Sequence, residues 1–237
     1  MGGGTWTRGI VKNVYVMPVS GGAERKLLQV DGQGGIHAWS PDSRQLVVIN
    51  DDKLVVVAAT GGEPEVLATE QNFDGGLQWS LDGKRVLYTA YNPGPQSDIF
   101  AIDIAGGEPM NLTEDPKHYH CPPFSCSPDG KKVAYTKIED DGDQHLWRFD
   151  LETGRKESLN TIAYNPVWSP DGNRIAFWSW RGEHICDIWA LDVNTGQFQQ
   201  ITDDPDDKED LAWSPDGNFI AFEITREDRQ LWLMDLQ

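Results

Sequence analysis

The chain has 237 residues, 38% hydrophobic and 10% aromatic, which is enough to pack a core and excludes disorder as its general state. Its 20 basic and 38 acidic residues give a net charge of −18, which repels a phosphate backbone, so we expect no nucleic-acid partner. No apolar run reaches about 18 residues, so we expect no membrane insertion, and the first residues lack the segments of a signal peptide. Three cysteines without a Cys-x-x-Cys pair argue against a disulfide framework or a zinc finger.

A turn motif recurs along the chain at spacings of 40, 47, 42 and 45 residues. Its copies are Trp39-Ser-Pro-Asp-Ser, Trp79-Ser-Leu-Asp-Gly, Cys126-Ser-Pro-Asp-Gly, Trp168-Ser-Pro-Asp-Gly and Trp213-Ser-Pro-Asp-Gly. Proline presets φ for a type I turn, aspartate suits the second position, and glycine takes the left-handed position that closes a hairpin. The motif therefore predicts a hairpin in each copy, with a strand before the turn and a strand after it.

Further strands follow each hairpin in chain order. The strands after the turn are expected at 46–49, 86–89, 133–136, 175–178 and 220–223, and the next strands at 54–58, 99–103, 146–150, 188–192 and 231–235. In the first four copies a glycine-bearing turn leads to a fourth stretch that ends near Leu67, Leu112, Leu159 or Ile201. Four strands, called A to D, in about 40 to 45 residues are typical of one propeller blade.

The predicted fold class is all-β, a β-propeller of about six four-stranded blades. Five repeats are full or nearly full, and residues 14–18 and 25–28 supply strands C and D of a partial N-terminal blade. Residues 1–12 are expected to be an N-terminal extension of a single propeller domain over 13–237. The expected blades lie near 13–30, 36–69, 77–113, 123–160, 165–202 and 211–237. In the alternative, a five-bladed ring, residues 24–28 complete the last blade as its outer strand.

The repeat is written most fully from Trp168 to Thr202, as Trp-Ser-Pro-Asp-Gly-x-x-Ile-Ala-Phe, then Asp-Ile-Trp-x-x-Asp, Gly and Ile-Thr. This pattern resembles the blades of TolB-like β-propellers, and also those of prolyl oligopeptidase-type enzymes and oligogalacturonate lyases. Departures are local, since Ser43 replaces the turn glycine, Leu81 the proline and Cys126 the tryptophan. The resemblance implies a propeller scaffold and leans toward a periplasmic location. The repeated tryptophans are expected to be wedges between sheets.

Strand direction sorts the loops onto two rims. The Pro-Asp-Gly and glycine turns lie at one end of the blades, called the turn rim, and the D–A and B–C loops lie at the other end, called the loop rim. The irregular segments 50–53, 90–97, 113–123, 138–144, 179–186 and 202–210 all fall on the loop rim. Binding residues usually sit on variable loops held by a rigid scaffold, so this rim is the expected functional face.

Two sets of residues on the loop rim are candidate sites. The expected partner-binding residues are Tyr91, His118, Tyr119, His120, Tyr164, Trp180, Arg181 and His184. A speculative site for a divalent cation, calcium or a transition metal, comprises His118, His120, Asp140, Asp141 and Asp143, because a His-x-His pair on an extended segment points both imidazoles to one side. The alternatives are packing aromatic residues, unliganded histidines and solvated acidic loops, and we expect no other cofactor.

The predicted function is a non-catalytic TolB-like scaffold that binds a protein or peptide through the irregular acidic loop rim. The chain has no Gly-x-Ser-x-Gly, no His-Glu-x-x-His and no phosphate loop, so no catalytic residue is assigned and the prediction leans away from an enzyme. The alternatives are a metal-assisted polysaccharide lyase or hydrolase of the oligogalacturonate-lyase type, or a propeller fragment of a prolyl oligopeptidase-like enzyme. Unpaired terminal strands also suggest self-association.

Overall fold

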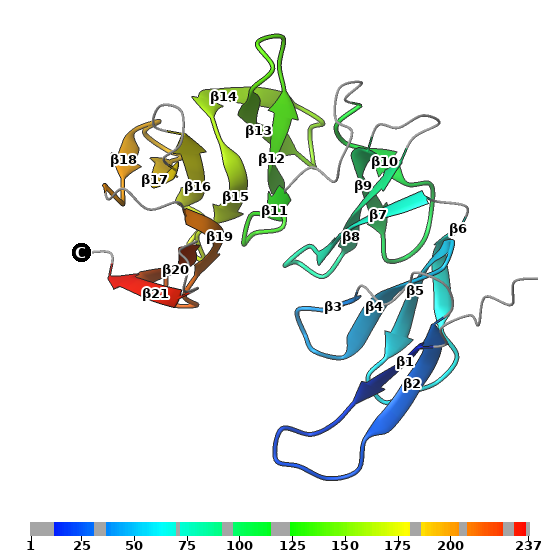
Figure 1. The fold of residues 1–237 in the computed structure, drawn as a ribbon. Helices are drawn as coiled ribbons and strands as arrows, with labels where there is room; N and C mark the ends of the chain where they lie inside the picture. Colours follow the sequence, from blue (N-terminus) through cyan, green and yellow to red (C-terminus); the bar gives the residue numbers. More distant parts are fainter. Residues whose placement is uncertain are drawn as a thin grey trace, which may run out of the picture.

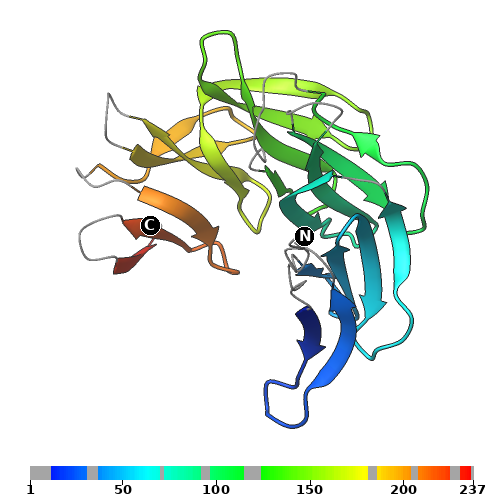
Figure 2. The same cartoon turned by 45° about the vertical axis from the view of Figure 1, so that its right-hand side comes forward.

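A computed structural model of the chain describes residues 12–30, 37–69, 72–91, 97–114, 124–180, 186–203, 208–224 and 230–235. The regular elements in these ranges are β-strands, which form antiparallel sheets that follow one another along an arc (Figures 1 and 2). Among the described residues no helix has the length and apolarity needed to cross a bilayer. The predicted all-β propeller architecture is confirmed.

Six sheets, numbered here in chain order, contain the described strands. Sheet 1 has β1 (Lys12–Val16) and β2 (Arg25–Val30), and sheet 2 has β3 (His37–Trp39), β4 (Gln45–Asn50), β5 (Lys53–Ala58) and β6 (Glu65–Thr69). Sheet 3 has β7 (Asn72–Trp79), β8 (Arg85–Tyr91), β9 (Ser97–Asp103) and β10 (Met110–Asn111). Sheet 4 has β11 (Phe124–Cys126), β12 (Lys132–Ile138), β13 (Gln144–Asp150) and β14 (Lys156–Ile162). Sheet 5 has β15 (Tyr164–Trp168), β16 (Arg174–Trp180), β17 (Cys186–Asp192) and β18 (Phe198–Gln200), and sheet 6 has β19 (Lys208–Trp213), β20 (Phe219–Ile224) and β21 (Gln230–Asp235).

The two ends of the arc do not join. Sheet 1 contains only β1 and β2 among the described strands, and β2 pairs with β1 rather than with the three-stranded sheet 6. In the described residues, β2 therefore does not add to the last blade as the five-bladed alternative expects, and the number of blades stays a prediction. Figure 2 shows the two end sheets on opposite sides of an opening in the arc.

The turn motif folds through the same contacts in all five copies. The serine hydroxyl donates to the aspartate Oδ1 over 2.6–2.7 Å, and this oxygen also accepts the N–H two residues further on over 3.0–3.1 Å. The serine oxygen in turn accepts the N–H five residues ahead over 2.9 Å. The serine–aspartate pairs are Ser40–Asp42, Ser80–Asp82, Ser127–Asp129, Ser169–Asp171 and Ser214–Asp216. Ser43 takes the left-handed conformation (φ 59°) that glycine takes in the other copies.

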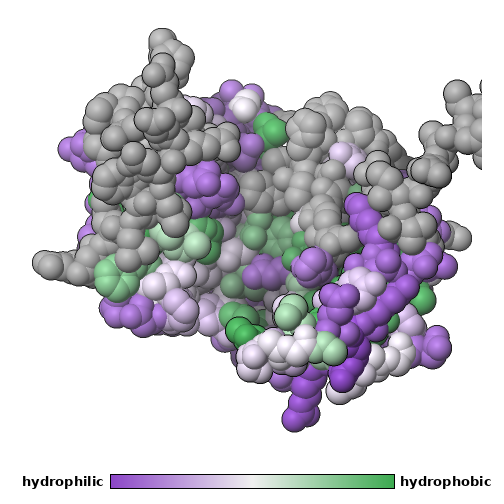
Figure 3. Space-filling view, turned by 60° about the horizontal axis from the view of Figure 1, so that its bottom comes forward, coloured by the Kyte–Doolittle hydropathy of each residue, from purple (hydrophilic) through white to green (hydrophobic). Residues whose placement is uncertain are grey.

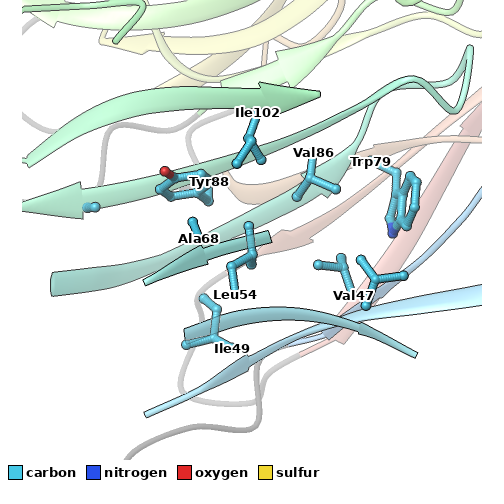
Figure 4. Packing of buried hydrophobic residues seen from close by; sticks show 10 residues of the cluster. Val47, Ile49, Leu54, Ala68, Trp79, Val86, Tyr88 and Ile102 are labelled. Carbon is cyan, nitrogen blue, oxygen red and sulfur yellow. The ribbon is translucent and has the colours of Figure 1, made fainter. Parts of the chain in front are cut away.

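The hydrophobic cores lie between successive sheets. In the core between sheets 2 and 3, Val47, Ile49 and Leu54 face Trp79 and Tyr88 (Figure 4). Among the coloured residues of Figure 3, hydrophobic side chains show as separate groups between hydrophilic ones. Successive sheets thus bury their facing surfaces against each other, as the blades of a propeller do.

The repeated tryptophans do not all act as wedges. Trp79 is 3% exposed and its indole N–H donates to the Ala38 carbonyl over 3.1 Å, and Trp213 makes the same bond to Val167. Trp39, in contrast, is 47% exposed. A wedge packs on strand A of the preceding sheet, and sheet 1 offers no such strand in the described residues, so the expectation for Trp39 was wrong.

Candidate functional site

Three aromatic side chains gather at the loop-rim end of sheet 5. Tyr164 begins β15 and pairs across the sheet with Trp178 of β16, and Trp180 lies two residues further along β16 on the same face. The Tyr164 and Trp178 rings stack with centroids 4.4 Å apart, and the Trp180 ring is in T-shaped contact with both, with centroids 6.4 and 5.7 Å away. We call Tyr164, Trp178 and Trp180 the aromatic cluster.

Backbone geometry beside Tyr164 sets this arrangement. A β-bulge interrupts the β15–β16 register between Tyr164 and Val167, and Asn165 in the bulge has φ 49°, a left-handed value that asparagine tolerates better than most residues. A bulge changes the direction of neighbouring side chains and strengthens the local twist. Tyr164 therefore stacks on Trp178 while Val167 still pairs with Ala176 below it.

Within the aromatic cluster, Trp178 is packed against the core and Trp180 is partly exposed. Trp178 is half-buried and packs against the core between sheets 5 and 6, which includes Leu211 and Phe222. Trp180 at the end of the strand is 45% exposed. Indole combines a large apolar surface with a polar N–H, which is why exposed tryptophans are frequent at binding surfaces.

An acidic hairpin tip lies on the adjacent sheet, between β12 and β13. It consists of residues 139–143, Glu-Asp-Asp-Gly-Asp, and we call it the acidic tip. Glu139 accepts the Trp147 indole N–H over 2.9 Å and lies 3.7 Å from the Lys137 ammonium group. Asp141 lies 2.9 Å from His145 Nε2. Hydrogen bonds from the backbone of Asp143 and from His145 hold the pKa of Asp141 below its usual value.

The Asp143 carboxylate differs from its neighbours, because no cation in the described part of the chain pairs with it. It lies close enough to Tyr164 to interact with it electrostatically. Burial raises the pKa of Tyr164, and the Asp143 charge raises it further, while hydrogen bonds from Trp180 and from the Gln144 backbone oppose this shift. The Tyr164 hydroxyl therefore stays protonated at neutral pH.

A main-chain contact joins the tip to the cluster. The Ala163 N–H, just before Tyr164, donates to the carbonyl of Gln144, just after Asp143, over 2.9 Å. The aromatic cluster of sheet 5 and the acidic tip of sheet 4 thus meet in one surface on the loop rim. Chemically, this surface offers aromatic rings and a carboxylate that pairs with no cation among the described residues.

The structure brings together only some of the predicted partner-binding residues. Tyr164 and Trp180 share the aromatic cluster, whereas Tyr91 ends β8 in sheet 3, where it pairs with Asn72 and Ser97. The others, His118, Tyr119, His120, Arg181 and His184, lie outside the described residues. Their place on the loop rim therefore stays a prediction.

The predicted cation site is described only in part. Within the described ranges no group of three or more His, Cys, Asp or Glu side chains could hold a metal ion, so Asp140, Asp141 and Asp143 do not form such a group by themselves. His118 and His120 fall outside those ranges. The metal site therefore also stays a prediction.

Sequence reasoning missed the role of His145. In sheets 3 and 5 a buried aspartate near the start of strand C accepts a threonine hydroxyl, over 2.7 Å for Asp98–Thr113 and 3.3 Å for Asp187–Thr202. His145 takes the corresponding place in β13 and bonds to Asp141 instead. Alignment of the repeats would have marked this substitution as a departure on the loop rim.

The turn rim carries grooves of another kind. A groove of about 390 Å³ lies between sheets 4 and 5, lined by Pro128, Trp168 and Gly172 among others, and one of about 430 Å³ lies at the corresponding place between sheets 2 and 3, lined by Pro41 and Trp79. Because the same repeat residues form both grooves, they follow from the blade geometry.

By its fold, the chain is an all-β propeller-type protein, and its loop rim carries an aromatic and acidic surface. Residues 121–237 match the TolB beta propeller domain family. The structure of TolB from Acinetobacter baumannii superposes with a TM-score of 0.68 at 20% identity, over 94% of this chain and 57% of that one. The second half of the chain therefore matches the TolB propeller family, and the chain as a whole has a TolB-like β-propeller fold.

The chain is also similar to two other proteins, one in structure and one in sequence. An oligogalacturonate lyase in complex with manganese has a TM-score of 0.66 at 16% identity, over 96% of this chain and 71% of that one. Dipeptidyl-peptidase 5 of Porphyromonas gingivalis is 33% identical over 101 residues, which is 38% of this chain. The chain spans only 15% of the length of that peptidase. These likenesses establish the fold and leave the activity open.

Proposed function

We propose that this propeller is a non-catalytic interaction module whose loop rim binds a protein or peptide. The observation that carries the proposal is the aromatic cluster, where the partly exposed Trp180 packs on Tyr164 and Trp178 beside the Asp143 carboxylate, which pairs with no cation in the described part of the chain. Interface hot spots are enriched in tryptophan and tyrosine at well-packed positions.

The chemistry of the described residues favours recognition over catalysis. The aromatic cluster and the acidic tip supply stacking surfaces, hydrogen bonds and negative charge. The Cys126 thiol, a potential nucleophile elsewhere, is buried, and burial raises its pKa to about 12. It is therefore a protonated, inaccessible thiol at neutral pH.

Selection of binding peptides from a random displayed library tests this proposal. We expect the selected peptides to bind the native protein and to lose affinity for Trp180→Ala and Asp143→Asn. Trp39→Ala is the matched control, because Trp39 is as exposed as Trp180 but lies in sheet 2, and Asp52→Asn is the control for charge. Peptides that bind all four variants equally would show that this surface is not the binding face.

The metal-assisted lyase is the second candidate. It is supported by the fold shared with the manganese-bound oligogalacturonate lyase and by the His118-Tyr-His120 segment. Metal analysis of the purified protein and an assay for unsaturated uronate products test it. A stoichiometric divalent ion lost in a His118→Ala, His120→Ala variant would favour the lyase over the interaction module. The identity with part of a dipeptidyl-peptidase supports the remaining alternative, a propeller that serves a peptidase.

A further inference from the structure

Resting on the proposed function, we infer that the loop-rim surface recognises a basic peptide, with an arginine or lysine side chain held between the aromatic cluster and Asp143. The inference specifies the chemistry of the partner. It follows from the ring geometry, from a carboxylate that no described cation pairs with, and from an internal example of the same contact.

The rings form a corner, and one of its sides, Trp180, is partly exposed. Trp178 and Tyr164 are stacked with an interplanar angle of 10°, and Trp180 stands at 90° to Trp178 with centroids 5.7 Å apart. Trp180 is 45% exposed, so part of its ring is accessible to a ligand. The face of an aromatic ring carries negative charge density, and tryptophan attracts cations most strongly.

The carboxylates of the acidic tip are not equivalent. Glu139 is occupied by Lys137 and Trp147, and Asp141 by His145. Asp143 pairs with no cation within the described ranges, yet it lies within electrostatic reach of Tyr164. A cation beside the cluster would therefore meet a carboxylate that no described cation already neutralises.

The same hairpin shows this type of recognition within the chain. The Lys137 ammonium group lies 4.9 Å from the centroid of the Trp147 ring, and 3.7 Å from the Glu139 carboxylate. Glu139 also accepts the Trp147 N–H. The aromatic cluster and Asp143 together repeat two of these three components, indole and carboxylate, and the third, the cation, would come from the partner.

The overall charge favours a basic partner as well. A net charge of −18 attracts cationic segments over long distances and speeds their association at low salt. Extended peptides expose their side chains, so one arginine can enter the corner while its neighbours face the acidic tip.

Three synthetic peptides test the inference: acetyl-Gly-Ala-Arg-Ala-Gly-amide, its citrulline counterpart, which is nearly the same shape without the charge, and its glutamate counterpart. The readout is the set of indole N–H signals of the isotope-labelled protein. Trp178→Phe, Trp180→Phe and Trp39→Phe assign the three signals of interest. We expect the arginine peptide to shift the Trp178 and Trp180 signals in a saturable way and to leave the Trp39 signal unmoved.

Variants give the expected magnitudes. Trp180→Ala should weaken the arginine peptide by about 2- to 30-fold, the range of a cation–π contact. Asp143→Asn should lower the affinity for the arginine peptide severalfold and reduce the salt dependence of binding. Asp52→Asn should have a smaller effect on both quantities. Unchanged thermal midpoints would show that the variants are folded.

Several results would overturn the inference. Equal shifts by the citrulline and arginine peptides would exclude charge recognition. In another such result, the native protein does not bind the arginine peptide, and the Arg181→Gln substitution shifts the Trp180 signal without peptide. The chain would then fill the site with its own arginine. If library peptides bind this surface without basic residues, the inference fails while the proposed function stands, and if they bind elsewhere, the proposed function fails first.

Discussion

The two rims of the sheets are built differently. At the turn rim, all five serine–aspartate pairs have the same bonds, with serine–aspartate distances that differ by only 0.1 Å. At the loop rim, neighbouring sheets differ, since Asp98 and Asp187 bond to threonines while His145 bonds to the acidic tip. The contacts that repeat from sheet to sheet therefore stabilise the blades, whereas the residues that depart from the repeat form the candidate binding surface. Substitutions at equivalent positions can test this division.

The largest effect should come from a buried wedge. Trp79→Ala removes an indole that is 3% exposed and packed between sheets 2 and 3, so it should lower the free energy of unfolding by about 3–5 kcal/mol. Trp39→Ala, at the equivalent but exposed position, should cost less than about 1 kcal/mol. Urea denaturation followed by circular dichroism measures both. Equal losses would show that Trp39 packs as Trp79 does.

The turn glycines should rank by the space around them. Gly130 and Gly217 have φ values of 69° and 74°, but a Cβ at Gly130 would lie 2.8 Å from the Asp82 Cγ, whereas one at Gly217 would lie 3.8 Å from Pro170. Both substitutions to alanine carry left-handed strain of about 1–2 kcal/mol, and Gly130→Ala adds a clash of about 1–3 kcal/mol. Gly172→Val should cost about 1–3 kcal/mol. A thermal midpoint that falls further for Gly130→Ala than for Gly217→Ala would support a turn with glycine in the left-handed position. An unchanged midpoint for Gly172→Val would contradict that turn type.

The serine–aspartate bonds should make stability depend on pH. The hydrogen bond from Ser169 holds the pKa of Asp171 below its usual value, and Ser40 and Ser214 act in the same way on Asp42 and Asp216. A folded-state pKa below the unfolded value of about 3.9 stabilises the fold above that pH, and the contribution is lost as the pH falls through the folded-state pKa. Urea midpoints should therefore fall with acidification below about pH 4.

Ser169→Ala isolates this contribution. Removing the buried hydroxyl should cost about 1–3 kcal/mol at neutral pH, because the Arg174 N–H and the Asp171 carboxylate both lose a partner. The difference from the native protein should shrink in acid, once Asp171 is protonated in both. A difference that stays constant down to the lowest pH would show that the bond does not depend on the aspartate charge.

The smallest effect on stability should come from the loop rim. Trp180→Ala and Asp143→Asn should change the free energy of unfolding by no more than about 0.5–1 kcal/mol, because one side chain is partly exposed and the other pairs with no described cation. Both should nevertheless weaken peptide binding. A large loss of stability in either variant would place these residues with the turn rim as structural elements.

The sequence predicts the blades well because their turns depend on local chemistry. Proline, aspartate and glycine at fixed positions specify each hairpin, and the observed strands follow the predicted runs closely, as in β9 and β17. Trp39 was mispredicted because its burial depends on a neighbouring sheet and not on its own motif. Whether sheet 1 pairs with sheet 6 was equally beyond local reasoning, since pairing of distant strands has no local signal.

The candidate site was predicted in part for the same reason. Tyr164 and Trp180 were identified from their place on the loop rim, while Trp178 was expected only to pack between blades. Its stacking on Tyr164 depends on the bulge at Asn165, and the lack of a described cation beside Asp143 depends on how the chain folds in space. Neither can be read from residue spacing alone.

The order of the strands also bears on how the chain folds. Every described strand pairs only with strands adjacent to it in sequence, from β1–β2 to β20–β21. Such short-range pairing keeps the loops to be closed small, which favours rapid formation of each sheet on its own, followed by docking of neighbours. Amide hydrogens in the middle sheets should therefore exchange most slowly, and those of sheets 1 and 6, which among the described residues pack against one neighbouring sheet each, should exchange first.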